Sequence, residues 1–125
     1  MTEKRLDLSP LHMALASLDV TPEQLAMIRA ILCAHIPGLR VWAFGSRAGG
    51  RGKPHSDLDL AIITQTPLPL AKLGMLEEAF AESDLPFRVD VIDWARTREA
   101  FRAIIRQSYV PLVGERTDGA ATRSA

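Results

Sequence analysis

Residues 44–62 read FGSRAGGRGKPHSDLDLAI, a glycine-rich, basic loop that ends in two aspartates at the start of an apolar strand. Because side chains alternate along a strand, Asp57 and Asp59 point to the same face of a sheet. Leu58 and Leu60 point to the opposite face, which helices would cover. Two carboxylates on one face repel each other, so this stretch predicts a ligand that compensates for their charge.

A third carboxylate lies farther along the chain. Asp90 sits between Val89 and Val91 in the apolar stretch 87–94, where a charge is costly unless it is paired or bound to a cation. If this stretch lies beside the strand 58–64 with Asp90 on the aspartates' face, three carboxylates converge. Mg²⁺ binds carboxylate oxygens and leaves room for substrate phosphates, and a pair of such ions can activate an attacking oxygen and stabilise a leaving one.

Other interpretations of these acidic residues stay open. A D-x-D pair alone is common on exposed surfaces, and Asp90 could be a strand-edge residue paired with Arg88 or with an arginine from a helix. Asp93 is close enough to be confused with Asp90, but its neighbour Trp94 suggests the exit of the strand. The loop that precedes the aspartates makes a metal site the stronger interpretation.

This loop has the composition of an anion site. Gly45 and Ser46 follow a strand directly, and a helical turn that begins there would offer free N–H groups and a favourable dipole to an anion. Arg47, Arg51 and Lys53 add local positive charge. The patterns of a P-loop, a G-x-G-x-x-G dinucleotide motif, a G-x-S-x-G elbow and a calcium loop are all absent.

The remaining pattern predicts a single α/β domain. Apolar residues at helical spacing indicate a helix over 22–36, with Thr21 and Gln24 as its capping box. The other expected elements are strands at 39–44 and 58–64, a helix at 69–83, a strand at 87–94, a helix capped by Thr97 with Phe101, Ile104 and Ile105 inward, and a short edge strand at 108–113 that contains Pro111. This order predicts a small mixed sheet covered by helices.

Length sets the domain organisation. A chain of 125 residues with 47% hydrophobic content can build one core and is too short for two. We expect residues 1–20 to form an N-terminal extension with a short helix and 21–114 to form the functional domain. The polar stretch 115–125 has almost nothing to bury, and we expect it to be disordered.

Charge and targeting patterns narrow the function classes. The formal net charge is zero, so there is no global electrostatic case for binding a nucleic acid or a membrane. A single cysteine, Cys33, excludes an internal disulfide and is expected to pack near the core face of its helix. No signal peptide or membrane span is visible, and we expect a cytoplasmic protein.

The combination of these motifs resembles a known family. Gly45-Ser46, ten further residues, Asp57-x-Asp59 and a later strand with Asp90 resemble the nucleotidyltransferase superfamily with the polymerase-β-like fold. The stretch is most similar to the minimal nucleotidyltransferases, and the resemblance covers about residues 22–113. It implies the polymerase-β-like nucleotidyltransferase fold and transfer of a nucleoside monophosphate from an NTP, with pyrophosphate leaving.

The resemblance also implies roles for individual residues. Gly45 and Ser46 would bind the triphosphate of ATP. Asp57 and Asp59 would hold two Mg²⁺ ions, and Asp90 would complete the catalytic metal site and help to activate the acceptor hydroxyl. Arg47 and Arg51 are further candidates for nucleotide binding. Many relatives read G-S-R-A-R-G, whereas this chain has Gly49 in place of the second arginine; Arg51 would therefore have to reach the phosphates differently.

Partners follow from the same resemblance. Many minimal nucleotidyltransferases pair with a helical toxin of the HEPN type, act as its antitoxin, and in some cases adenylylate a tyrosine on it. We therefore expect an antitoxin that transfers AMP to a hydroxyl of a HEPN-type toxin. A catalytically silent antitoxin and a transferase for a small, aminoglycoside-like substrate are the alternatives, and a homo-oligomer stays open.

Overall fold

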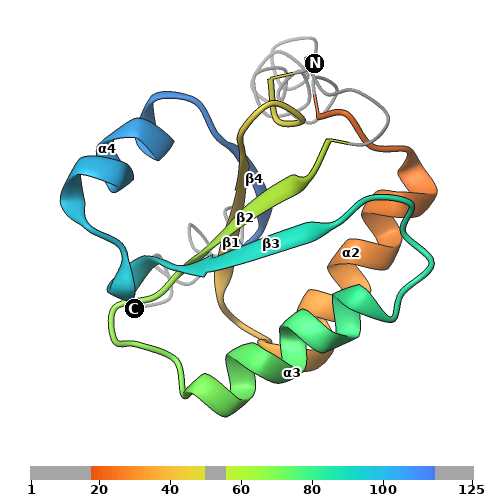
Figure 1. Ribbon diagram of the computed structural model, residues 1–125, viewed down its shortest axis with the longest axis horizontal. Coiled ribbons are helices and arrows are strands. Elements are labelled where there is room, and N and C mark those ends of the chain that lie inside the picture. Colours follow the sequence, from red (N-terminus) through yellow and green to blue (C-terminus); the bar gives the residue numbers. More distant parts are fainter. Residues whose placement is uncertain (1–17, 50–55, 115–125) are drawn as a thin grey trace, which may run out of the picture.

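The computed structural model describes residues 18–49 and 56–114, which form a four-stranded sheet with helices on both faces (Figure 1). The elements, in chain order, are α2 (Pro22–His35), β1 (Arg40–Phe44), β2 (Leu58–Ile63), α3 (Leu70–Ala81), β3 (Val89–Asp93), a short 3₁₀ helix η1 (Trp94–Arg96), α4 (Glu99–Gln107) and β4 (Val110–Val113). The expected mixed α/β architecture is confirmed. Within the described residues, no helix is long and apolar enough to cross a membrane.

The strand order is β3-β2-β1-β4. β1 pairs antiparallel with both β2 and β4, whereas β2 and β3 are parallel. A parallel pair needs a crossover connection, and α3 provides it. Pro111 lies in β4 at one edge of the sheet, as expected for a residue that cannot donate a backbone hydrogen bond.

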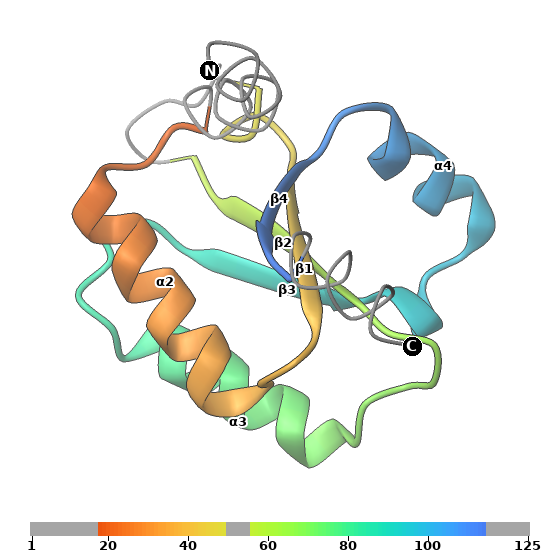
Figure 2. The ribbon, with the colours of Figure 1, turned by 180° about the vertical axis from the view of Figure 1, so that it is seen from behind.

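The main core lies on one face of the sheet. α2 and α3 run side by side over this face, while α4 lies on the other side, as both views show (Figures 1 and 2). Leu58 and Leu60 of β2 are fully buried there, as the alternation predicted. Helix residues that pack on them include Ile28, Leu32, Leu76 and Phe80. Because Leu58 and Leu60 fill this face, the odd-numbered residues of β2, Asp59 among them, must point to the other one.

Helix α2 confirms the predicted start. The Thr21 side chain accepts a hydrogen bond from the N–H of Gln24, and the Gln24 side chain accepts one from the N–H of Thr21. Ile28, Leu32 and Ile36 are buried, but Cys33 is exposed. The expectation that Cys33 packs in the core is therefore wrong, because one residue of helix turns its side chain about 100° away from the buried stripe.

Helix α4 departs from expectation in two ways. Thr97 does not cap it: the helix begins after Arg98, and the Thr97 hydroxyl donates to the C=O of Asp93 (2.8 Å). Phe101 and Ile104 are 41% and 60% exposed, so only one of the three predicted apolar side chains, Ile105, is buried.

A charged residue accounts for this rotation of the helix. Arg102 turns toward η1 and donates to the C=O of Trp94 through Nε (3.1 Å) and a terminal nitrogen (2.7 Å). Arg102 and Ile105 lie three positions apart, on one stripe. The polar contact of Arg102 therefore sets the inward face of α4 and leaves Ile104 in solvent.

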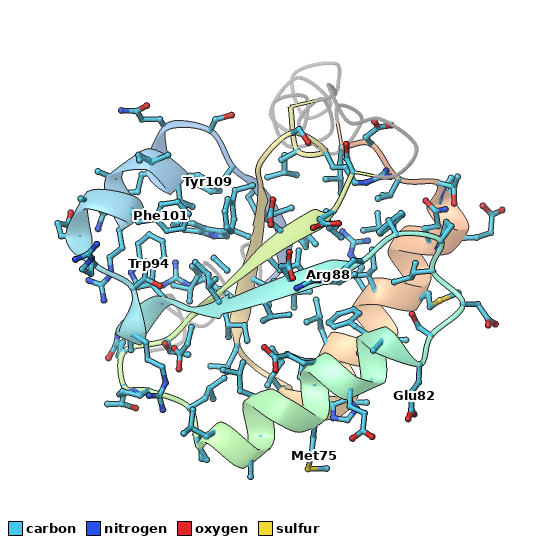
Figure 3. All side chains as sticks on the ribbon, in the orientation of Figure 1. Met75, Glu82, Arg88, Trp94, Phe101 and Tyr109 are labelled. Atoms are coloured by element: carbon cyan, nitrogen blue, oxygen red, sulfur yellow. The ribbon has the colours of Figure 1, made fainter. Side chains whose placement is uncertain are left out.

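A second, smaller apolar cluster lies under α4 and η1. Its buried members are Ala61, Trp94 and Ile105. Trp42 stacks on Tyr109 with ring centroids 3.9 Å apart and meets Trp94 edge to face at 5.4 Å. Trp94 and Tyr109 lie between α4 and the sheet (Figure 3). Both tryptophans are therefore packing residues.

Candidate functional site: three carboxylates and a glycine turn

The parallel pairing of β2 and β3 sets Asp59 directly beside Asp90 as its register partner. Asp57 precedes β2 by one residue, two positions from Asp59. All three lie on the sheet face opposite the main core, because Leu58 and Leu60 fill that core. The predicted site depended on residue 90 lying beside residue 59 on the aspartates' face. The structure confirms this arrangement.

The electrostatics of the trio centre on Asp59. Burial raises the pKa of the Asp59 carboxyl above its ordinary value, and the nearby carboxylates of Asp90 and Asp57 raise this pKa further. Each of these effects disfavours the charged form of Asp59. A cation beside Asp59 would oppose all of them, because it would neutralise the repulsion and replace the lost hydration.

The donor chemistry of the trio suits a hard divalent cation, since every candidate ligand is a carboxylate oxygen. The side chains are nevertheless not assembled into a ready-made cage: in residues 18–49 and 56–114, no group of three or more His, Cys, Asp or Glu side chains could hold a metal ion as arranged. Instead, Arg88 Nε pairs with Asp90 Oδ1 at 3.0 Å, and the Arg88 side chain is 76% exposed (Figure 3). The exposed Arg88 side chain therefore provides part of the charge compensation that a cation would otherwise provide.

Gly45 lies against the central carboxylate. Phe44, the last residue of β1, is the register partner of Asp59, so the next residue passes directly beside that side chain. The backbone of Gly45 has φ +84°, and a Cβ at this position would collide with Asp59 Oδ2. Position 45 therefore needs glycine for both its backbone conformation and its close approach.

The segment after Gly45 is a tight turn. The N–H of Ala48 donates to the C=O of Gly45, and the N–H of Gly49 donates to the C=O of Ser46, each at 3.2 Å. Ser46 is half-buried at the start of this turn. Gly45 and Ser46 thus lie at the same end of the sheet as Asp59, which is where the sequence placed the phosphate-binding turn.

Arg47 has a structural role that the sequence did not reveal. It is only 5% exposed, and its guanidinium donates to the C=O of Ser56 through Nε (2.7 Å) and to the C=O of Asp19 (2.6 Å). The same group lies over the Phe87 ring, 4.1 Å from the centroid. Arg47 therefore joins the two sides of the loop that carries the motif. Its contact with a nucleotide stays a prediction, and Arg51 lies outside the described residues.

Asp93 is a polar core residue whose importance sequence reasoning missed. It is 3% exposed, accepts hydrogen bonds from the Thr64 hydroxyl and the N–H groups of Leu68 (2.7 Å) and Ala95 (3.2 Å), and pairs with Arg96 Nε at 3.3 Å. Its side chain caps η1. An aspartate just before a helical turn is a capping signal, and Asp93 holds that position in the sequence.

Comparison with known proteins agrees with this geometry. Residues 25–113 match the nucleotidyltransferase domain family. A Haemophilus influenzae protein described as "Probable protein adenylyltransferase MntA" is 55% identical over 95 residues, which make up 76% of this chain and 83% of that protein.

Solved structures of toxin–antitoxin proteins also match this chain. A crystal structure of a toxin–antitoxin with AMP-PNP contains a chain that matches with a TM-score of 0.65 and 25% identity, over 75% of this chain and 76% of that one. A mutant of the toxin–antitoxin MntA-HpeT matches with a TM-score of 0.60 and 26% identity, over 74% of each chain.

The fold and the site define a class: a small α/β domain that places a glycine-serine turn beside carboxylates from two parallel strands. This is the polymerase-β-like nucleotidyltransferase fold that the motif predicted. The chain belongs to the nucleotidyltransferase domain family.

Proposed function

We propose that this chain transfers AMP from ATP to a hydroxyl of a partner protein and thereby acts as the antitoxin of a HEPN-type toxin. The observation that carries the proposal is the register of Asp59 with Asp90, next to the close approach of Gly45. The 55% identical relative described as a probable protein adenylyltransferase supports AMP and a protein acceptor. The likeness to toxin–antitoxin structures, one with AMP-PNP, supports the toxin partner and ATP.

The reaction replaces a phosphoanhydride bond of ATP with a phosphoester bond to the acceptor. The acceptor oxygen attacks the α-phosphorus of ATP in line, a new O–P bond forms, and the bond from that phosphorus to the bridging oxygen breaks. Pyrophosphate leaves with the electron pair, and the proton of the hydroxyl passes to Asp90. Positioning and charge neutralisation provide most of the catalysis in such transfers.

Each part of the site has a task in this scheme. Asp57, Asp59 and Asp90 would hold Mg²⁺, which supplies charge neutralisation when bound. Gly45 and Ser46 would receive the triphosphate, because a glycine lets phosphate oxygens approach the backbone. Arg47 fixes the loop through its two carbonyl contacts, which keeps the turn against Asp59.

The proposal is tested with ATP labelled at the α-phosphate, Mg²⁺ and the co-expressed HEPN-type toxin. We expect the toxin to acquire the label, and no label from ATP labelled at the γ-phosphate. Asp59→Asn should abolish transfer, whereas Asp84→Asn, which changes an exposed aspartate after α3, should retain it. Transfer that persists in Asp59→Asn would contradict the assignment. A tight complex without any transfer in the unmodified chain would favour the catalytically silent antitoxin.

A further inference from the structure

The outer edge of β3 is open. β3 is the terminal strand of the sheet, and within residues 18–49 and 56–114 no strand pairs with its other side. The N–H of Leu58 donates to the C=O of Arg88 at 2.8 Å. This bond shows which residues of β3 turn their backbone N–H and C=O groups toward β2. Arg88 and Asp90 therefore direct backbone groups toward β2, and Val89 and Val91 direct theirs toward the open edge. An edge with free backbone groups is a template for one more strand.

A groove runs along this edge between β3 and α3. Its volume is about 680 Å³, and its lining combines Phe80, Ala81 and Leu85 with Val89 and Asp90. The groove therefore continues from an apolar surface to one of the three carboxylates. This combination suits an extended polypeptide, whose backbone pairs with the strand while apolar side chains occupy the groove.

The register of β2 with β3 determines where such a polypeptide would place its side chains. Asp59 and Asp90 form one row across β2 and β3. Neighbouring strands lie about 4.8 Å apart, and register partners point to the same face. A residue on an added strand opposite Asp90 would thus extend this row on the carboxylate face. A serine, threonine or tyrosine there would bring its hydroxyl to the carboxylates.

We propose that the partner protein presents its acceptor hydroxyl on an extended segment that adds to the open edge of β3. The proposal rests on the proposed function, since it describes how the acceptor of that reaction reaches the site. The occupant is the partner because Asp90 lines the groove, and the acceptor of a transfer reaction has to arrive at that carboxylate. Backbone pairing would provide affinity, and the row through Asp59 and Asp90 would select the residue that is modified.

Hydrogen exchange of the full chain, measured amide by amide with and without the HEPN-type toxin, tests this directly. In the free chain the amides of Val89 and Val91 should exchange faster than those of Asp90 and Ile92. Toxin binding should slow exchange at Val89 and Val91. The amides of β4, at the opposite edge of the sheet, serve as the internal control and should change little.

Two results would overturn the proposal. One is protection of β4 or of neither edge on toxin binding. The other is full protection of Val89 and Val91 in the free chain, which would mean that another part of this chain already occupies the edge.

A matched pair of variants gives a second readout. Ala81→Trp fills the groove from α3, and Ala71→Trp adds the same bulk to an exposed position of α3 that does not line the groove. We expect Ala81→Trp to lower kcat/KM for toxin modification about tenfold or more, with unchanged ATP binding. Ala71→Trp should leave both quantities unchanged, and equal rates for the two variants would count against the groove.

Different outcomes would refute the proposed AMP transfer and the proposed pairing of the partner with β3. If the unmodified chain transfers AMP and Ala81→Trp transfers it equally well, the groove is wrong and the proposed function stands. If the unmodified chain transfers nothing, the proposed function is wrong, while the hydrogen-exchange pattern still decides whether the partner pairs with β3.

Discussion

Gly45 and Asp59 pack so closely that a side chain at position 45 would overlap the Asp59 carboxylate. Gly45→Ala should therefore disturb the site twice, through a strained positive φ and through displacement of Asp59. We expect a stability loss of about 1–3 kcal/mol together with loss of ATP binding. Thermal unfolding and ATP titration in the presence of Mg²⁺ measure the two effects.

Gly38 provides the matched control. It has nearly the same backbone conformation, φ +85°, but a Cβ there would meet nothing within 4 Å. Gly38→Ala should show a similar strain cost and keep normal ATP binding. If both variants bind ATP equally well, the contact between Gly45 and Asp59 has no part in nucleotide binding.

Asp59→Asn should separate stability from activity. In the absence of Mg²⁺ at neutral pH, this change removes a carboxylate that Asp90 and Asp57 repel, and the free energy of unfolding should rise by on the order of 0.5 kcal/mol. Addition of Mg²⁺ should raise the Tm of the unmodified chain and not that of the variant. A metal-free variant that is clearly less stable than the unmodified chain would show that Asp59 has a structural partner instead.

The raised pKa of Asp59 predicts a pH dependence with a definite sign. The folded chain holds the Asp59 proton more tightly than the unfolded chain does. In metal-free protein, the contribution of this group to stability is therefore fully present below the unfolded pKa and is lost as the pH rises through the folded one. Because Mg²⁺ needs the deprotonated carboxylate, Mg²⁺ binding should weaken as the pH falls through that same raised pKa.

A carboxyl NMR titration of metal-free protein checks the cause of the shift. Asp90→Asn should lower the pKa of Asp59, because it removes a neighbouring negative charge. Asp84→Asn changes an exposed aspartate that does not contribute to the shift and should leave the titration unchanged. An unaltered Asp59 titration in Asp90→Asn would mean that the two carboxylates do not interact.

Arg47→Lys should destabilise the chain even without ATP. Lysine cannot reproduce the fork that donates to the C=O groups of Ser56 and Asp19, nor the stacking on Phe87. We expect a loss of about 2–3 kcal/mol in denaturant unfolding. Arg98→Lys, at the exposed residue before α4, should cost little. Unchanged stability with weaker ATP binding would instead make Arg47 a phosphate ligand alone.

The fold and the central geometry could be predicted from sequence because they follow from alternation. Asp57 and Asp59 are two residues apart, so they share one face of the sheet. Asp90 lies between two valines, and it occupies that same face when its strand pairs with β2 in the observed register. Alternation left open whether the two strands are neighbours, and the register of Asp59 and Asp90 shows that they are.

The misjudged features depend on long-range contacts. Arg47 is held by the backbone carbonyls of residues 19 and 56. No local sequence pattern predicts these contacts. The rotation of α4 depends on a bond from Arg102 to the backbone of Trp94. Apolar spacing alone therefore placed Ile104 on the wrong side, whereas Phe101 is partly exposed but still packs on Phe44.

Intact-mass measurement of the HEPN-type toxin, co-expressed with this chain and then incubated with ATP and Mg²⁺, decides whether the chain transfers AMP to its partner. We expect the toxin to gain the mass of one or more AMP groups, and this gain to be absent with Asp57→Ala. A toxin whose mass stays unchanged with the intact chain, or increases equally with Asp57→Ala, would contradict it.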